Sequence, residues 1–463
     1  MDLLRCISPI DGSLVAERPC ASAAEVAEAL SRAGRAQTDW ARRPLTERAE
    51  RCLRMVEAFE AQREAISREI TLQMGRPLCH SPGEVTGFAE RARAMIELAE
   101  AALADVIPEP RPGFRRFVRR EPLGVVLTIA PWNYPYLTAV NSIVPALMAG
   151  NAVLLRHSAQ TLLCGERIAE AFAAAELPEG VFQVLHLGHQ QTERLVAADA
   201  VDFVAFTGSV AVGRLVQNAA RERFIGVGLE LGGKDPAYVR ADADLTHAAE
   251  NLAEGAFFNA GQSCCGIERI YVASGVFADF VERLAAEASR LRLGNPLESD
   301  TTLGPLVRAQ AADFVRDQLS EAMAAGARAL LDVEGFSADE RGSAYLAPQV
   351  LVDVDHGMRV MSEESFGPIV GVMPVRDDAE AISRMNDSAY GLTACVWTRD
   401  EEAALRIGAE VQTGTFFMNR CDYLDPYLAW TGVKDSGRGC TLSRLGYESL
   451  TRPKSFHLRL SER

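Results

Sequence analysis

In the first part of this chain, apolar and polar residues alternate with the period of a helix. In later parts, apolar residues form uninterrupted runs. From Ala23 to about Ala104 the apolar positions are spaced as on one face of a helix, among many Ala, Glu and Arg residues. The pattern breaks at Gly75-Arg76-Pro77 and at Ser81-Pro82-Gly83. We therefore expect several amphipathic helices that pack on a core.

A different pattern starts at Gly124. Residues 124–130 are almost wholly apolar, which is typical of a strand buried on both faces of a parallel sheet. Comparable runs at 152–155, 181–187 and 201–206 are separated by helical segments, one of which ends after 144–148 at a Gly-Asn signal. Strands that alternate with helices predict an α/β fold with doubly wound parallel sheets.

Three segments predict exposed strands. Residues 8–17 read as a hairpin with an Asp-Gly turn. Residues 111–120 alternate Phe and Val with arginines after Arg-Pro-Gly, which indicates an exposed β-arm or a solvated hairpin. Residues 455–460 alternate again, which predicts a final strand at an interface.

Composition narrows the class of protein. The 463 residues carry a net charge of −15, which disfavours binding to nucleic acid or to an anionic membrane. No apolar stretch has the length of a transmembrane helix and the start lacks a signal peptide, so we expect a cytoplasmic protein. The ten cysteines include no CxxC pair and the seven histidines do not cluster near them, so we expect neither a metal site nor a disulfide framework.

Two adjacent thiols lie in a glycine-bounded segment. Gly261 and Gly266 flank Cys264 and Cys265, so the thiols are expected on a tight turn. They could be buried small hydrophobes, as most free cysteines are. Upstream, Glu230 lies between apolar residues and beside a diglycine, where desolvation would raise its pKa towards that of a general base.

Other polar residues follow predicted strands. Asn133 comes just after the 124–130 strand, at the carboxyl end where α/β sheets place ligands, although an Asn in a Pro-rich turn is usually only a turn residue. Thr207-Gly208-Ser209, with Gly213, could bring backbone N–H groups to a phosphate, but it lacks the GxGxxG pattern. Residues 363–368, Glu-Glu-Ser-Phe-Gly-Pro, could form a solvated loop.

Taken together, these segments resemble the aldehyde dehydrogenase superfamily over nearly the whole chain. The matching segments, in order, are Pro131-Trp132-Asn133-Tyr134-Pro135, Phe206-Thr207-Gly208-Ser209, Glu230-Leu231-Gly232-Gly233-Lys234, Phe257 to Cys264 and Glu363 to Pro368. The 34-residue interval between Glu230 and Cys264 also matches the family's spacing. The likeness is to the NAD(P)-dependent, non-acylating type.

The resemblance implies a set of roles. Cys264 would be the nucleophile, Glu230 the base that activates water, and the Asn133 amide a donor to the oxyanion. An NAD or NADP cofactor would lie against Trp132, Arg156, Ser158, Gly208, Ser209, Gly213, Leu231, Gly232, Glu364 and Phe366. A small aldehyde would be held by Tyr134, Asn141, Ser263, Cys265, Asp422 and Trp430.

Three departures from the family pattern have consequences. At 156–159 the chain has Arg156-His157-Ser158-Ala159, without the glutamate that binds the adenine ribose in NAD-preferring members, so NADP could be accepted or preferred. Ser142 occupies the place of a lysine linked to proton movement near the base. In the loop 419–432, Asp422 and Trp430 could receive an apolar or cationic aldehyde, or the aspartate could only cap a turn.

The family plan also implies a domain organisation. Residues 1–104 and 124–230 would form the cofactor domain, 231–432 the catalytic domain, 105–123 an oligomerisation β-arm, and 433–463 a C-terminal tail. A homodimer or homotetramer is expected from the arm.

Two rival functions stay open. An acylating relative would pass the thioester to coenzyme A or phosphate, whereas a glutamate at position 230 favours hydrolysis. A catalytically idle structural homologue is the other alternative, which the presence of Cys264, Glu230 and Asn133 disfavours.

Overall fold

Two large β-sheets organise the protein, whose computed structural model describes residues 2–460. The six-stranded sheet contains, in spatial order, β16 (Gly437–Arg438), β8 (Gly226–Glu230), β7 (Phe203–Thr207), β4 (Val125–Ala130), β5 (Ala152–His157) and β6 (Phe182–Val184). Its neighbouring strands are parallel, except that β16 is antiparallel to β8. The chain thus returns to this sheet after completing the second one.

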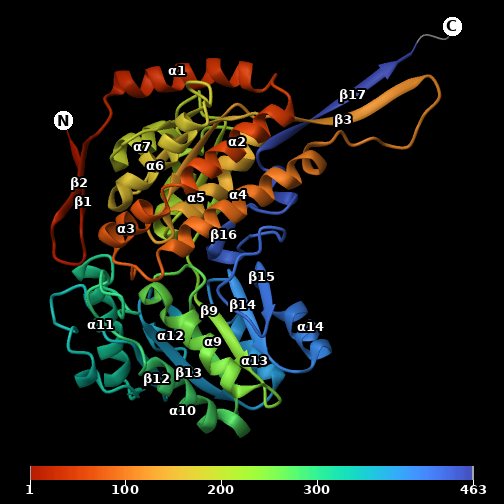
Figure 1. Cartoon of the computed structure of the whole chain (residues 1–463). Coiled ribbons are helices and arrows are strands. Elements are labelled where there is room, and N and C mark those ends of the chain that lie inside the picture. The colour runs from red at the N-terminus through yellow and green to blue at the C-terminus, as the bar shows by residue number, and fades with distance from the viewer. Residues whose placement is uncertain (1, 461–463) are drawn as a thin grey trace.

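The seven-stranded sheet is built from the later part of the chain. In spatial order it contains β11 (Arg328–Ala329), β12 (Gln349–Val352), β13 (Ile369–Val375), β10 (Ile267–Ala273), β9 (Asp235–Val239), β14 (Thr393–Trp397) and β15 (Thr415–Met418). Only the short edge strand β11 is antiparallel to its neighbour. Figure 1 shows this sheet below the six-stranded one.

Helices cover both faces of the six-stranded sheet. Alternate residues of β4 point to opposite faces, so Val125, Leu127 and Ile129 join one core and Val126 the other. The first core is closed by α1 (Ala23–Trp40), α7 (His189–Val196) and α8 (Val210–Ala219). The second is closed by α2 (Leu45–Glu60), α3 (Arg63–Met74), α4 (Pro82–Leu103), α5 (Pro135–Met148) and α6 (Leu162–Ala174).

The seven-stranded sheet is covered in the same way. One face carries α9 (Leu245–Phe257) and α10 (Phe277–Ala288), and the other carries α11 (Ala309–Ala324), α12 (Arg359–Ser362), α13 (Asp378–Asn386) and α14 (Glu401–Glu410). Short 3-10 helices are η1 (Ala159–Thr161), η2 (Phe258–Gly261), η3 (Ser274–Val276), η4 (Val333–Gly335), η5 (Lys434–Ser436) and η6 (Leu445–Tyr447). The architecture is therefore the predicted doubly wound α/β class.

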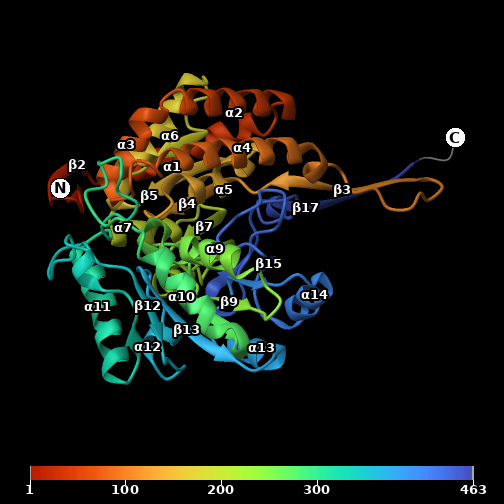
Figure 2. The ribbon, with the colours of Figure 1, turned by 60° about the horizontal axis from the view of Figure 1, so that its bottom comes forward.

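A two-stranded ribbon projects from the body in both Figure 1 and Figure 2. It pairs β3 (Phe114–Pro122) with β17 (Thr451–Arg459) in antiparallel register, and Phe117 stacks on Phe456 with ring centroids 4.5 Å apart. Both predicted strands are confirmed, but β3 pairs with the C-terminal strand rather than forming a local hairpin. The last three residues of the predicted tail lie outside the described residues.

The predicted N-terminal hairpin is confirmed as β1 (Leu3–Ile7) and β2 (Leu14–Pro19), with Gly12 in the left-handed region at φ 76°. The predicted breaks fall between α3 and α4. The helix expected through 144–148 begins at Pro135, and one prediction was inaccurate in length: the strand expected at 181–187 keeps only Phe182–Val184. Within residues 2–460, no helix combines the length and apolar character that crossing a bilayer requires.

Candidate active site

The Cys264 thiol lies on a turn between α9 and β10, as predicted. After α9 the backbone reverses through Asn259 and Ala260, both in the left-handed region at φ 54° and 56°, and then Gly261 at φ 70°. A Cβ on Gly261 would lie 2.2 Å from the Gly367 carbonyl oxygen, so only glycine fits there. This reversal separates the thiol from the preceding helix and leaves it partly exposed.

Glu230 is the last residue of β8, at the carboxyl end of the parallel sheet. Its carboxylate accepts hydrogen bonds from the hydroxyls of Thr207, at 2.9 Å, and Thr441. Burial raises the pKa of Glu230, and the two threonine hydroxyls act in the opposite direction. The raised pKa that the apolar flank predicts is confirmed.

Two cavities meet at Cys264 and Glu230. The first, which we call the Tyr134 cavity, has a volume of about 580 Å³ and also contacts Arg91, Asn141 and Asp422. The second, the Phe366 cavity, has about 530 Å³. The residues that line both cavities are Thr207, Glu230, Leu231 and Cys264. A molecule in either cavity can therefore reach the thiol and the carboxylate.

Asn133 lies where the thiol segment begins. Its side-chain amide donates to the Gln262 carbonyl oxygen at 3.3 Å, two residues before Cys264, and its side chain is buried against the Phe366 cavity. Three residues from distant parts of the sequence, Asn133, Glu230 and Cys264, thus line one space.

The neighbouring thiol of Cys265 has different surroundings. It is only 3 % exposed and donates a hydrogen bond to Asp422 Oδ1 at 2.9 Å, which the Ser263 hydroxyl also contacts at 3.0 Å. Its hydrogen bond with Cys264 and its burial raise the pKa of the Cys265 thiol well above its usual range. Cys265 is therefore poorly suited to act as a thiolate.

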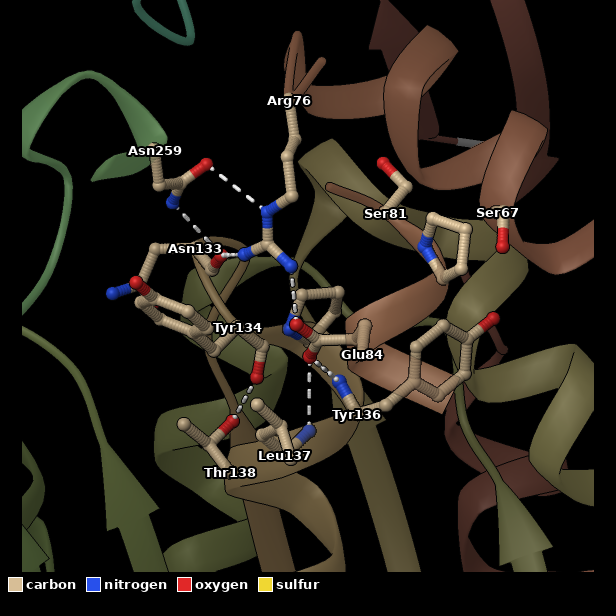
Figure 3. Close-up of polar contacts among 12 residues, drawn as sticks. Ser67, Arg76, Ser81, Glu84, Asn133, Tyr134, Tyr136, Leu137, Thr138 and Asn259 are labelled. Carbon is tan, nitrogen blue, oxygen red and sulfur yellow. Dashed lines mark hydrogen bonds and ion pairs between the residues drawn. The ribbon is translucent and has the colours of Figure 1, made fainter. Parts of the chain in front are cut away.

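A buried ion pair that the sequence did not reveal holds Asn133 in place (Figure 3). The Arg76 guanidinium pairs with Glu84 and donates to the Asn133 carbonyl oxygen at 2.6 Å and to Asn259 Oδ1 at 3.1 Å. It joins the turn before α5 to the turn before Cys264. The only sequence feature that hinted at this ion pair was the Gly75-Arg76-Pro77 break, which placed an arginine at the end of a helix.

Glu84 performs a second task in the same cluster. Its Oε1 accepts the backbone N–H groups of Tyr136 and Leu137, at 2.9 and 3.0 Å. Both N–H groups lie in the first turn of α5, where the helix itself offers no hydrogen-bond acceptor for them. Pro135 suits the first helical position. Helix α5 therefore begins at Pro135, and it ends at Met148, before the predicted Gly-Asn stop.

We expect Arg76→Met to lower the free energy of unfolding by about 3–5 kcal/mol, because it leaves the Glu84 carboxylate buried without its partner. Urea denaturation measures the loss. Arg93→Met is the matched control, since Arg93 is on the exposed face of α4 and pairs with Glu60 in water, where we expect a loss below about 1 kcal/mol. A similar small loss for both variants would contradict the prediction.

The predicted cofactor residues divide into two groups. The walls of the Phe366 cavity include Trp132, Gly208, Ser209, Leu231, Gly232, Glu364 and Phe366. Arg156, Ser158 and Gly213 are not among them. Arg156 is at the carboxyl end of β5 with a buried Nε that has no partner within residues 2–460, Ser158 caps η1, and Gly213 packs in α8 against Leu231.

The Phe366 cavity is shaped by close contacts. A Cβ at Gly232 would lie 2.2 Å from Glu364 Oε1, and the Gly233 N–H donates to the same oxygen at 3.1 Å. Burial, and next the charge of Glu268, raise the pKa of Glu364 to about 8. The rings of Trp132 and Phe366 meet edge to face with centroids 5.7 Å apart.

A second buried ion pair, missed from the sequence, supports this loop. Lys234 pairs with Glu268 and donates to the Ser365 hydroxyl at 3.0 Å. Glu268 also accepts the backbone N–H groups of Ser365 and Phe366, at 2.8 and 2.9 Å. The sequence showed Lys234 as part of the Glu230–Lys234 segment, but it did not predict the partner, Glu268, 34 residues further on.

All six predicted substrate-pocket residues line the Tyr134 cavity: Tyr134, Asn141, Ser263, Cys265, Asp422 and Trp430. Asp422 does not cap a turn. Its Oδ1 accepts from Ser263 and Cys265, and burial raises its pKa. The sequence analysis missed Arg91 and Arg420 in this wall, although Arg91 interrupts the apolar stripe of α4.

Ser142 is close to the far side of Glu230. Its hydroxyl shares a hydrogen bond of 2.9 Å with Thr128 Oγ1, and both residues line a small cavity that also contacts Glu230 and Thr441. Hydroxyl groups therefore occupy the surroundings of the carboxylate where a lysine was expected.

Fold and cavities together define a class of protein: a doubly wound α/β enzyme in which a glutamate at the carboxyl end of β8 and a cysteine on the turn before β10 line the same cavity. Comparison with known proteins identifies the family. The model of the aldehyde dehydrogenase family matches residues 2–456, and the chain belongs to that family.

Several relatives are similar over their whole length. A 3-sulfolactaldehyde dehydrogenase of Pseudomonas putida is 34 % identical over 95 % of this chain and 90 % of its own. A succinate semialdehyde dehydrogenase of Escherichia coli described as using NAD(P)+ is 32 % identical over 95 % of this chain and 94 % of its own. The crystal structure of an NADP-dependent glyceraldehyde-3-phosphate dehydrogenase from Bacillus halodurans superposes with a TM-score of 0.93 at 33 % identity, covering 99 % of this chain and 96 % of its own.

Proposed function

We propose that this protein oxidises a small aldehyde to its carboxylic acid with NAD or NADP, through a covalent intermediate on Cys264. The observation that carries this proposal is that Cys264 and Glu230 line both the Tyr134 cavity and the Phe366 cavity. An aldehyde in the first and a nicotinamide in the second would then share the thiol.

The first step is attack by the Cys264 thiolate on the aldehyde carbonyl, which gives a thiohemiacetal. The carbonyl oxygen of the aldehyde becomes an anion in this step, and the Asn133 side-chain amide would donate a hydrogen bond to it. A donor fixed in advance where charge develops is worth on the order of 3 kcal/mol. The Arg76–Glu84 pair keeps that amide in position by fixing the Asn133 backbone.

The Phe366 cavity fits a dinucleotide. The glycine at 232 permits close approach beside Glu364, and the N-terminus of α8 at Gly208-Ser209 offers backbone N–H groups to a phosphate. A nicotinamide bound there would supply the acceptor for the hydride of the thiohemiacetal carbon, whose oxidation would leave a thioester on Cys264. Trp132, Glu364 and Phe366 would hold that end of the cofactor, and Arg156 with Ser158 the adenosine end.

Glu230 then serves as the general base. Its raised pKa keeps it a competent proton acceptor, and it takes a proton from the water that attacks the thioester carbonyl. The acid leaves and the thiol is regenerated. The hydroxyls of Thr207 and Thr441 orient the carboxylate for this role.

We further propose the domain division 1–104 with 124–230, 231–432, 105–123 and 433–463, and a homodimer or homotetramer that assembles through the β3–β17 ribbon. The stacked Phe117 and Phe456 rings give that ribbon an apolar surface with which a second copy could pair.

Because Ala159 follows Ser158 in place of an acidic residue, NADP would not be repelled, and we propose that it is accepted or preferred.

A panel of short, long, aromatic, amino and carboxylated aldehydes, each with NAD and with NADP, tests the proposal. We expect formation of reduced cofactor and of a free acid for at least one aldehyde, with rates unaffected by coenzyme A. Acyl-coenzyme A as the product would establish the acylating alternative, and no turnover with any aldehyde would favour an idle homologue. A strong kinetic preference for NAD would refute the preference for NADP.

A further inference from the structure

One buried cation in the Tyr134 cavity forms no ion pair with a carboxylate of residues 2–460. Arg91, on α4, is 8 % exposed and lines the cavity. Its Nη1 donates to the Leu137 carbonyl oxygen at 2.7 Å and to Asn141 Oδ1 at 3.3 Å. Within residues 2–460, its Nε and Nη2 atoms have no hydrogen-bond partner, and no carboxylate forms an ion pair with it.

The charges of Glu84 and Glu230 counteract the lowering of the Arg91 pKa by burial, but neither carboxylate contacts Arg91 directly, and Glu230 accepts from Thr207 and Thr441 instead. Glu90 and Glu254 are exposed to water, and Arg420 lies over the Tyr423 ring at 3.4 Å. The Asp422 carboxylate is directed at Ser263 and Cys265. Glu84, on the same helix, already pairs with Arg76.

A buried guanidinium without a directly paired anion is unfavourable, so it indicates a ligand that supplies one. The two bonds to Nη1 fix the plane of the group and leave free the edge formed by Nε and Nη2. That edge presents two parallel N–H donors, the geometry that binds both oxygens of a carboxylate or another planar or tetrahedral oxyanion.

We propose that Arg91 binds the anionic end of the aldehyde, so that the preferred substrates are short aldehydes carrying a carboxylate or similar oxyanion. This inference rests on the proposed function, because it assumes that the carbonyl of the same molecule is at Cys264. The cavity joins the two points, since Arg91 and Cys264 both line it. The cationic aldehydes considered from the sequence would meet the Arg91 charge and be disfavoured.

The test compares aldehydes of equal chain length that differ in charge. Wild-type enzyme is assayed with succinic semialdehyde, its methyl ester and butanal, at saturating cofactor. We expect kcat/KM for succinic semialdehyde to exceed that for butanal by at least about tenfold, and the ratio to fall roughly 10- to 100-fold in Arg91→Gln, as for loss of a charged hydrogen bond. The loss should appear mainly in KM.

Arg93→Gln is the matched control. It is two residues further along α4, outside the cavity and paired with Glu60 in solvent, and it should leave the ratio unchanged. If Arg91→Gln does not fold, the wild-type preference for the acid over its methyl ester still decides the matter. Glyoxylate and the malonic and glutaric semialdehydes extend the series and report the distance between Arg91 and the thiol.

Different results would contradict the role of Arg91 and the proposed function. Equal or better oxidation of butanal and of the ester, together with a ratio that Arg91→Gln does not change, would overturn this inference and leave the proposed function standing. No oxidation of any aldehyde in the series, or in the wider panel, would reject the proposed function itself.

Discussion

Cys264→Ala is expected to lower turnover by about 10⁴-fold or more while leaving cofactor binding nearly intact. The side chain removed is the group that would form the covalent bond, whereas the Phe366 cavity keeps Trp132, Glu364 and Phe366. Steady-state rates and calorimetric titration with NAD and NADP measure the two effects separately.

Cys265→Ala supplies the control for that experiment, because the two thiols are adjacent and only one is buried against Asp422. We expect this variant to remain active. The assignment would be reversed by an active Cys264→Ala accompanied by an inactive Cys265→Ala.

The second large effect is expected for Glu230→Gln, in which the acid should be released roughly 10²- to 10⁴-fold more slowly. Glutamine keeps the shape of the side chain but cannot accept the proton of the attacking water. Formation of the thioester does not need this base, so a burst of reduced cofactor, equal to the enzyme concentration, should precede a slow steady state. Rapid-mixing absorbance records the burst.

The pH dependence provides a separate check on Glu230. A base works when deprotonated, so kcat should decline as the pH falls through the raised pKa of Glu230, and Glu230→Gln should lose this acidic limb. The Thr441 hydroxyl lowers that pKa by donating to the carboxylate, so Thr441→Val should move the limb to higher pH. An acidic limb that stays the same in both variants would assign it to another group.

The segments that sequence reasoning identified well are those whose chemistry depends on neighbouring residues. Glycines on both sides of the thiols required a turn, and the turn is present with three consecutive left-handed residues. The apolar flank of Glu230 predicted desolvation, which is the main cause of its raised pKa. Solid apolar runs predicted buried parallel strands because such strands have no solvent face.

What the sequence missed are pairings between distant segments. Glu84 caps α5, Glu268 holds the loop at 364–366 and β17 supplies the partner of β3, and each of these contacts joins residues at least 52 positions apart in the sequence. A local sequence pattern can indicate that a side chain requires a partner, for example that an arginine requires an anion. It does not identify the distant residue that supplies this partner.

The sequence by itself therefore determined the fold class and the family likeness and predicted the reactive residues, because turns, apolar runs and motif spacings are local properties of the chain. Only the tertiary structure decided that Cys264 rather than Cys265 is accessible, that Asp422 faces Cys265, and that Arg91 is buried without an ion pair to any carboxylate of residues 2–460. The physical reason is that burial and charge compensation depend on what folds around a side chain, and those neighbours come from every part of the chain.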